Sequence, residues 1–186
     1  MNVAFATIPG WTSGTWTADT STSEIGFSVR LLGVLTVKGR FNRFHITIRT
    51  GHHPLGSNAE ATIELGSVDT RNAKRDRHLR SPDFLATGGQ PAATYRSTGV
   101  RHTAAGWVVD GNLTVHGIER PVQLTAVETV FSTDADGRPR GNFIATARLS
   151  RGAFGIDRWT GGGAIIGDKV TVILNVNAVQ LEEATR

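Results

Sequence analysis

Apolar and polar residues alternate along most of this chain, and the alternation predicts β-strands. In the segment 24–31, Ile25, Phe27, Val29 and Leu31 occupy every second position, with polar or small residues between them. A period of two residues gives a strand one apolar face and one solvent-exposed face. The same reasoning predicts strands over residues 35–40, 44–49, 59–65, 93–99, 107–115, 122–131, 143–149 and 170–180.

Turn-forming residues separate the later strands. The sequences Ala-Ala-Gly at 104–106, His-Gly at 116–117 and Asp-Ala-Asp-Gly at 134–137 supply the glycine or aspartate that tight hairpins need. The order of the elements predicts an all-β, antiparallel meander. About eight such strands remove their exposed edges by closing into a barrel, which has room inside for packed side chains or one slender ligand. An open β-sandwich is the alternative.

One stretch interrupts the strands. Residues 71–80 carry charge on nearly every face of a helix, Asp69 or Thr70 can cap its start, and Pro82 ends it. With so few apolar positions the helix cannot enter a core. We therefore expect a short helical insertion near residues 70–85 that lies at the rim of the barrel, where it forms a lid or a mouth.

The inward faces of the predicted strands are apolar, and several of their residues are small. Small side chains on facing strands leave a slot, and an unfilled slot destabilises the protein by about 24 cal/mol per Å³. The alternative is a solid core, in which small residues pack against large ones. The small residues are Ala59, Ala61, Ser97, Ala145 and Ala147. The residues expected to line the lumen and contact a ligand are Phe27, Val29, Leu31, Phe41, Ala61, Ile63, Phe84, Tyr95, Leu113, Phe143 and Phe154.

The predicted mouth carries an acid between two bases. Asp76 is flanked by Arg75 and Arg77 in the helical insertion. Asp76 could orient an arginine toward the polar head of a ligand. It could equally form an ion pair across one helical turn, an effect of roughly 0.3 to 0.5 kcal/mol. We expect Arg75 and Asp76 to border the mouth and the head group of a ligand.

Length and composition indicate one folded domain. A chain of 186 residues with 39% hydrophobic and 19% charged residues can bury a sizeable core. We expect an irregular N-terminal arm over 1–14, a single barrel domain over 15–181 and a C-terminal tail over 182–186.

Composition also restricts the chemistry. The chain has no cysteine, which excludes disulfides, thiolate metal sites and thiol nucleophiles. Its six histidines show no metal-ligand spacing, and neither a Gly-x-Ser-x-Gly nor a His-Glu-x-x-His motif occurs. We expect no catalytic residues, no metal and no cofactor.

Charge and hydropathy restrict location and partners. The first residues lack a basic start and a continuous apolar run, so we expect no signal peptide and a cytoplasmic protein. No apolar stretch approaches the ~18 residues that a membrane span needs. The net charge of +4 comes largely from the insertion, without interleaved aromatic residues, so we expect no nucleic-acid partner.

Five segments together resemble a known family. They are Ile-Gly-Phe-Ser-Val at 25–29, Val-Lys-Gly-Arg-Phe at 37–41, the sequence RDRHLRSPDF at 75–84, Gly-Asn-Leu-Thr-Val-His-Gly at 111–117 and Arg-Gly-Ala-Phe-Gly-Ile at 151–156. Their order and spacing are similar to those of the YceI-like family. The resemblance implies a lipocalin-like, eight-stranded antiparallel barrel with a helical insertion. It also implies an elongated apolar tunnel for a long polyisoprenoid, such as a polyprenyl quinone, and a homodimer as a common assembly.

The chain departs from that family in two places. Two histidines that are frequent in the family are absent, because the first strand region reads Asp-Thr-Ser-Thr-Ser at 19–23 and Leu31 follows Arg30.

The residues and the resemblance together lead to one hypothesis. The protein binds, carries or stores a long-chain isoprenoid or fatty-acid-like lipid in its apolar lumen. Each buried CH₂ contributes ~0.8 kcal/mol, so a long chain binds tightly with few polar contacts. The alternatives are an interaction or regulatory module with a filled core and, less favoured, an enzyme.

Overall fold

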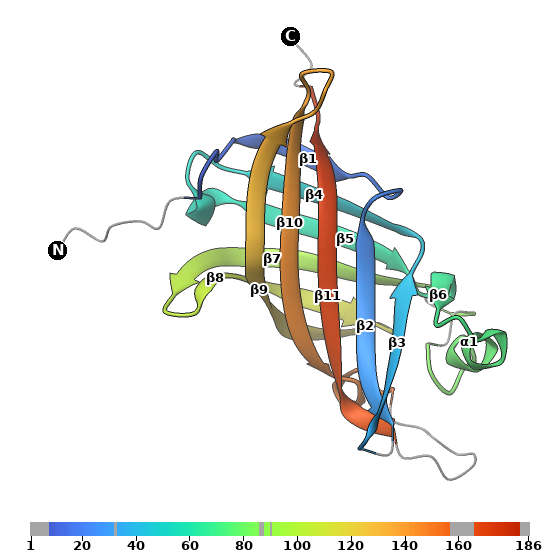
Figure 1. Cartoon of the computed structure of the whole chain (residues 1–186). Helices are drawn as coiled ribbons and strands as arrows, with labels where there is room; N and C mark the ends of the chain where they lie inside the picture. The colour runs from blue at the N-terminus through green and yellow to red at the C-terminus, as the bar shows by residue number, and fades with distance from the viewer. Residues whose placement is uncertain (1–7, 32, 86–87, 90, 157–165, 183–186) are drawn as a thin grey trace.

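The computed structural model describes residues 8–31, 33–85, 88–89, 91–156 and 166–182. One short helix, α1 (Ala73–Leu79), accompanies the strands, with the 3₁₀ turns η1 (Pro54–Gly56), η2 (Leu65–Ser67) and η3 (Gly152–Phe154) (Figure 1). The strands are β1 (Gly14–Ala18), β2 (Glu24–Leu31), β3 (Leu35–Phe41), β4 (Phe44–Thr50), β5 (Asn58–Glu64), β6 (Val68–Asp69), β7 (Ala92–Thr103), β8 (Gly106–Val115), β9 (Ile118–Thr133), β10 (Pro139–Ser150) and β11 (Ile166–Gln180).

Eight of these strands form a closed antiparallel ring in the order β1-β4-β5-β7-β8-β9-β10-β11. β1 closes it, because Trp16 pairs with Ile48 of β4 on one side and with Gln180 of β11 on the other. The expected eight-stranded barrel with one short helical insertion is therefore confirmed, and the open sandwich is wrong.

The start of the chain departs from a simple meander. β11 is long enough to pair with β1 near Ala178 and then with β2 from Asn175 to Ile166. A turn separates the two partners of β11, and it is held by the Asp19 N–H, which donates to the Asn177 carbonyl at 2.8 Å. β2, β3 and β6 therefore extend beyond the ring as a second wall on the side of α1 (Figure 1).

The helix starts later than expected, and its cap was predicted wrongly. The Asn72 side chain caps α1 by accepting a hydrogen bond from the Arg75 N–H at 3.0 Å. Asp69 instead accepts from the Arg71 N–H, and the Thr70 hydroxyl bonds to Asp76. Both predicted caps are thus engaged in the turn before the helix.

Several strands are longer than the alternation predicted. β9 begins at Ile118, upstream of Pro121, because its hairpin with β8 starts from the pair Val115 and Ile118. β7 and β10 extend in the same way at the end of the barrel away from α1. Cross-strand pairing therefore overrides the local turn signals that had shortened these elements.

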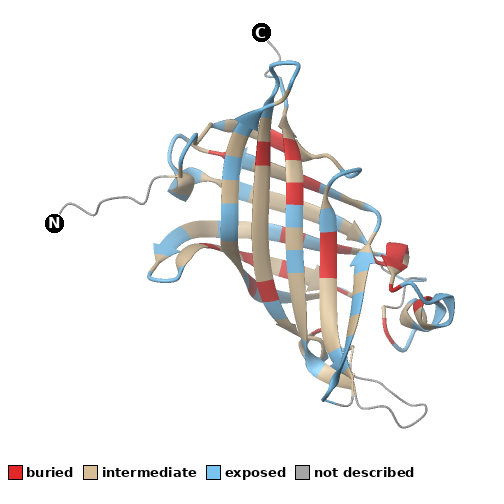
Figure 2. Cartoon of the chain, in the orientation of Figure 1, coloured by how far each residue is buried: buried red, intermediate tan, exposed pale blue. Residues whose placement is uncertain are grey.

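Most of the buried hydrophobic residues form two clusters, and Figure 2 shows buried residues on β2, β10 and β11 and beside α1. One cluster comprises Trp16, Ile25, Ile46, Val176 and Ala178. The other comprises Leu65, Ala93, Tyr95, Leu113, Val115, Val122, Ala147 and Phe154. Both clusters face the barrel interior, and partly buried side chains lie between them. The predicted boundaries at 14 and 181 lie at the ends of β1 and β11; residues 1–7 of the arm and 183–186 of the tail lie outside the described residues.

Candidate ligand-binding cavity

A cavity of about 810 Å³ occupies the barrel interior. Its walls come from β2, β3, β4, β5, β7, β8, β9, β10 and β11, and one end is bordered by α1 and η3. All eleven residues predicted to line the lumen do line this cavity: Phe27, Val29, Leu31, Phe41, Ala61, Ile63, Phe84, Tyr95, Leu113, Phe143 and Phe154. The interior is therefore hollow rather than filled by side chains, and the contact of these residues with a ligand stays a prediction.

Of the small residues, Ala59, Ala61, Ala145 and Ala147 also line the cavity. Ser97 is not among the described lining residues. Its hydroxyl accepts a hydrogen bond from the Ala59 N–H at 2.8 Å, next to a bulge in β7 that follows Ser97. Ser97 therefore stabilises the sheet beside that bulge.

One end of the cavity is sealed by aromatic side chains. Trp16 is fully buried, and its indole Nε1 donates to the Thr50 hydroxyl at 2.8 Å. Its ring centroid lies 5.3 Å from that of Phe131 and 6.4 Å from that of Phe143. Tilted and edge-on aromatic packing of this kind stabilises a core beyond the area that it buries. We call this the closed end.

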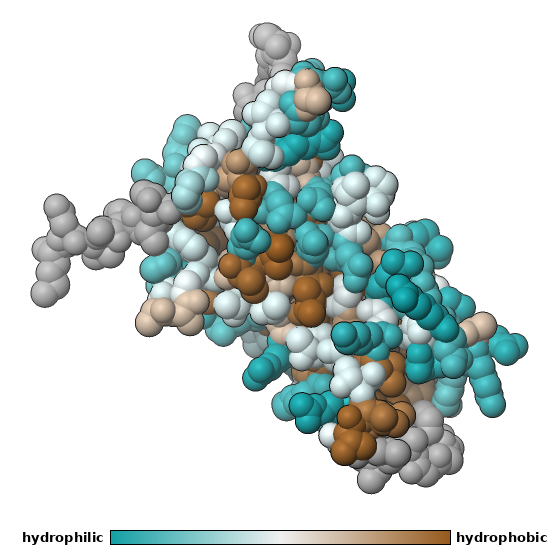
Figure 3. Space-filling model, viewed as in Figure 1, coloured by the Kyte–Doolittle hydropathy of each residue, from teal (hydrophilic) through white to brown (hydrophobic). Residues whose placement is uncertain are grey.

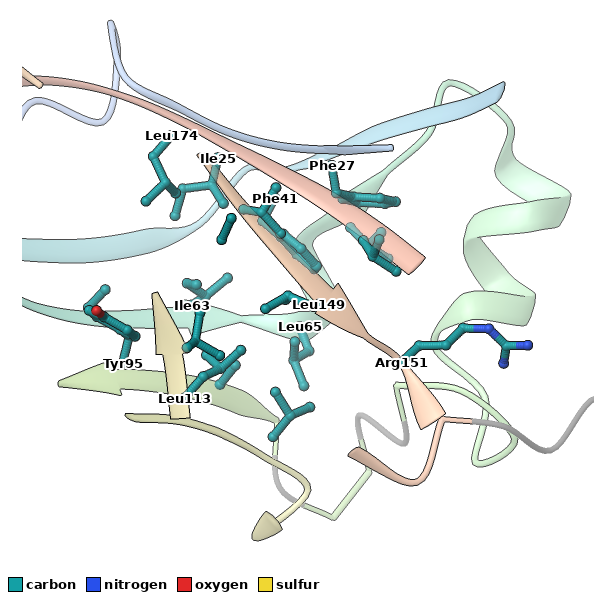
Figure 4. A pocket seen from close by; sticks show the side chains of 18 of the residues that line it. Ile25, Phe27, Phe41, Ile63, Leu65, Tyr95, Leu113, Leu149, Arg151 and Leu174 are labelled. Carbon is teal, nitrogen blue, oxygen red and sulfur yellow. The ribbon is translucent and has the colours of Figure 1, made fainter. Parts of the chain in front are cut away.

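The walls between the two ends are almost wholly apolar. In Figure 4, Ile25 lies on one side of the cavity and Ile63 and Leu113 lie together on the other. Tyr95 is an exception, and its hydroxyl donates to the Val109 carbonyl at 3.2 Å. Burial raises the pKa of the Tyr95 phenol well above its ordinary value, and the negative charge of Asp110 adds to the effect. Tyr95 therefore presents a neutral, internally bonded side chain to the lumen.

The other end, which we call the mouth, is bordered by α1. Arg75 lines the cavity there, and its guanidinium donates to the Thr70 hydroxyl at 2.7 Å and to the Thr70 carbonyl at 2.8 Å. Asp76 is buried beneath the helix and accepts from the N–H and the hydroxyl of Thr70. The Thr70 hydroxyl thus donates to Asp76 while accepting from Arg75. Asp76 is not among the described lining residues and acts on Arg75 through Thr70.

Two further cations at the mouth were missed from the sequence. Arg151 lines the cavity at the end of β10, close to α1 in Figure 4. Its guanidinium donates to the carbonyls of Ile156, Ile166 and Gly167, which joins η3 to the start of β11. Lys74 also lines the mouth from α1 and is exposed. The signal for Arg151 was its place at the head of the segment 151–156, directly after a predicted strand.

The segment after α1 is also fixed in place. Arg80 donates to the carbonyls of Gly66 and Val68, each at 2.8 Å. The ring of His116 bonds to the Leu85 carbonyl at 2.8 Å. These contacts hold Phe84, which is buried, against the cavity.

The described residues contain no group of three or more histidine and acidic side chains that could hold a metal ion. Among the same residues, no helix has the length and hydropathy needed to cross a bilayer.

Comparisons with known proteins agree with this architecture. A family model described as the YceI-like domain matches residues 16–178. A UPF0312 protein of Pseudomonas paraeruginosa is 34% identical over 157 residues, which are 84% of this chain and 81% of that protein. The crystal structure of Burkholderia cenocepacia BcnA superposes with a TM-score of 0.72 at 20% identity and covers 86% of this chain and 98% of its own.

A second solved structure is a polyisoprenoid binding domain from Saccharophagus degradans implicated in plant cell wall breakdown. It superposes with a TM-score of 0.62 at 16% identity and covers 89% of this chain and 98% of its own. Both superpositions show that this chain shares its overall fold with solved proteins.

Proposed function

The chain belongs to the YceI-like domain family, and on that premise we propose that it binds one long-chain isoprenoid lipid of the polyprenyl quinone type in the barrel cavity. The apolar tail fills the cavity and the head group lies at the mouth. The protein then acts as a carrier or store for that lipid. The polyisoprenoid binding domain among its structural neighbours supports this class of ligand.

The size and lining of the cavity carry this proposal. A volume of about 810 Å³ lies within the range of roughly 300 to 1,000 Å³ typical of small-molecule sites. At ~24 cal/mol per Å³, an empty void of that size in a packed core would destabilise a protein by about 20 kcal/mol. This exceeds the entire net stability of a typical domain, about 5 to 15 kcal/mol. A hollow of this size is therefore not a packing defect, and an apolar ligand that fills it removes the apolar walls from water.

The hollow interior argues against the interaction module with a filled core. That alternative requires the small residues to be packed against large neighbours. Ala61, Ala145 and Ala147 instead line open space together with larger residues from facing strands. The lumen offers an elongated apolar surface with few polar atoms, which suits a hydrocarbon chain better than a protein segment with its backbone hydrogen-bonding groups.

The polar residues at the mouth suit a head group. Arg75, Lys74 and Arg151 bring N–H donors to the same end of the cavity. Arg75 is positioned by Thr70, which Asp76 in turn holds. A quinone carbonyl or another oxygen-bearing head accepts hydrogen bonds from such donors, while the tail extends toward Trp16.

The proposal is tested by mass spectrometry of an organic extract from freshly purified protein, followed by titration of lipid-stripped protein with a polyprenyl quinone. Wild-type protein should carry about one lipid per chain. Ala61 contacts both buried clusters from the middle of the cavity, so Ala61→Trp obstructs it. Losing contact with two or more CH₂ groups lowers the affinity at least about tenfold.

Thr62→Trp is the matched control. Thr62 is the next residue of β5 and is exposed on the outer face, so the same bulk is added outside the cavity. Its lipid content and affinity should equal those of the wild type. A clean extract from protein that also ignores added polyprenyl quinones contradicts the proposal, as does equal loss of binding in both variants.

A further inference from the structure

The turn between β2 and β3 exposes large apolar side chains to solvent. Val34 is 82% exposed and Leu35 is 57% exposed. Gly33 turns the chain with a φ of 74°, and the Val34 N–H donates to the Leu31 carbonyl at 3.3 Å. Figure 3 shows hydrophobic residues gathered over this turn, at the end of the molecule where β2 and β3 meet. Exposed apolar side chains that are grouped together are a common feature of interaction sites.

We call Val34 and Leu35 the tip of the β2–β3 hairpin, and this tip lies beside the mouth of the cavity. Leu31 pairs with Leu35 across the hairpin and with Ile166 of β11 on its other side. Leu31 and Ile166 both line the cavity, as does Val37 in β3. The exposed apolar tip is therefore continuous with the apolar wall along which a lipid tail would enter.

Basic residues outnumber acidic ones around the tip. Between Ile25 and Phe41 the charged residues are Arg30, Lys38 and Arg40, and none is acidic. Arg30 and Lys38 are exposed and have no ion-pair partner among the described residues, whereas Arg40 pairs with Asp69 at 3.4 Å. The neighbouring segment 71–80 adds five cations and a single acid, Asp76.

The opposite end of the barrel carries acids instead. Exposed or half-buried carboxylates lie in its turns and at its last described residue, and they are Asp19, Glu24, Asp134, Asp136 and Glu182. The only cations among residues 132–140 are Arg138 and Arg140, and Arg140 pairs with Asp134 at 2.8 Å. Acids also lie at the mouth end, where Asp168 pairs with Lys169 at 3.5 Å and Asp83 is exposed, but the basic residues of the hairpin and of segment 71–80 outnumber them. The mouth end is therefore net positive, whereas the turns at the opposite end carry mainly acids.

We propose that the β2–β3 tip docks on a lipid bilayer that carries negative charge, with Val34 and Leu35 entering the interface and Arg30 and Lys38 facing the head groups. Apolar side chains favour the boundary between head groups and acyl chains, and each basic residue near an anionic surface adds to the attraction. A long apolar cargo resides in bilayers rather than in water, so docking places the mouth against its source. The inference rests on the proposed function and adds to it a surface through which the protein takes up its lipid from a bilayer.

The test is sedimentation of the lipid-stripped full chain with phosphatidylcholine vesicles, with and without phosphatidylglycerol. Wild-type protein should partition onto the anionic vesicles at least about tenfold more strongly than onto the neutral ones. Added salt should reduce that difference. Changing Val34 and Leu35 together to serine should lower partitioning onto the anionic vesicles by at least about tenfold.

The control changes Val127 and Ile173 to serine, since these residues are 63% and 48% exposed on the barrel wall away from the tip. It should sediment like the wild type. A second readout is tryptophan emission, which should shift to shorter wavelength on vesicle addition for Val34→Trp and stay constant for Val127→Trp, relative to the wild type.

Wild-type protein that ignores both vesicle types, or a tip variant that sediments like the wild type, overturns the docking proposal. Equal losses in the tip and wall variants overturn it as well. Titration with a polyprenyl quinone in the absence of vesicles, run in parallel, tests the proposed function separately. Retained quinone affinity in the tip variant with lost vesicle binding supports both proposals.

Discussion

The two ends of the barrel share most of their strands but differ in how their interiors are filled. At the closed end, large rings meet, and Trp16 is packed against Phe131 and Phe143 with its N–H satisfied by Thr50. Between this packed end and the mouth, alanines share the inner faces with half-buried aliphatic residues around open space. The alternating pattern is the same along the whole barrel, so it does not by itself distinguish the packed end from the cavity.

Two glycines, Gly141 at the closed end and Gly39 near the mouth, each allow a neighbouring side chain to approach the backbone closely. A Cβ on Gly141 would lie 2.7 Å from the Phe143 ring, so the absence of a side chain at Gly141 allows the aromatic rings of the closed end to pack together. A Cβ on Gly39 would lie 2.5 Å from the Phe27 ring and 2.8 Å from the Thr70 methyl group. Gly39 therefore allows the mouth wall to approach the segment that positions Arg75. The closed end should contribute mainly stability, and the mouth should contribute mainly binding.

The largest expected effect is at the closed end. Trp16→Ala removes a fully buried ring and leaves Thr50 without its donor, so the free energy of unfolding should fall by about 3 to 5 kcal/mol. Phe27→Ala removes a half-buried ring from the wall of an existing cavity and should lower it by less than about 2 kcal/mol. Urea unfolding of both variants measures the difference. An equal fall in the free energy of unfolding for both variants would show that the mouth is packed as tightly as the closed end.

A smaller effect is expected beneath α1. Asp76→Asn weakens the acceptor of two Thr70 hydrogen bonds and should lower the free energy of unfolding by about 1 to 3 kcal/mol. Because Thr70 positions Arg75, ligand affinity should fall as well. Asp83→Asn is the control, since Asp83 is exposed near the same helix, and it should change neither quantity. Unchanged stability in the Asp76 variant would show that the helix is held by other contacts.

The smallest effect concerns Tyr95, the only tyrosine of the chain. Burial raises the pKa of its phenol, so the folded protein favours the neutral form. The resulting stabilisation is fully present below the ordinary tyrosine pKa of about 10 and is lost as the pH rises through the higher folded value. Near-ultraviolet absorbance should show no phenolate at about pH 10.5 in native protein but half or more in urea. Ionisation at the ordinary pH in the native state would place Tyr95 in contact with solvent.

Much of the fold followed from local patterns. Alternation over segments such as 24–31 and 59–65 predicted strands, and the charged run at 71–80 predicted a polar helix. Successive side chains on a regular strand point to opposite faces of the sheet. The inward residues could therefore be identified from the sequence wherever the strand was regular. Ser97 was expected in the lumen, but its hydroxyl bonds to the Ala59 N–H beside a bulge, and bulges leave little trace in sequence.

The sequence by itself determined the all-β class, the inward apolar faces and the helical insertion, since these depend on neighbours a few residues apart. Only the tertiary structure decided that β11 pairs with both β1 and β2, that Asp76 acts on Arg75 through Thr70, and that Arg151 reaches the mouth. It also decided that the interior is hollow, because a cavity is the volume left over when distant strands close a ring. That volume depends on ring geometry and on residues far apart in the chain, which no local pattern encodes.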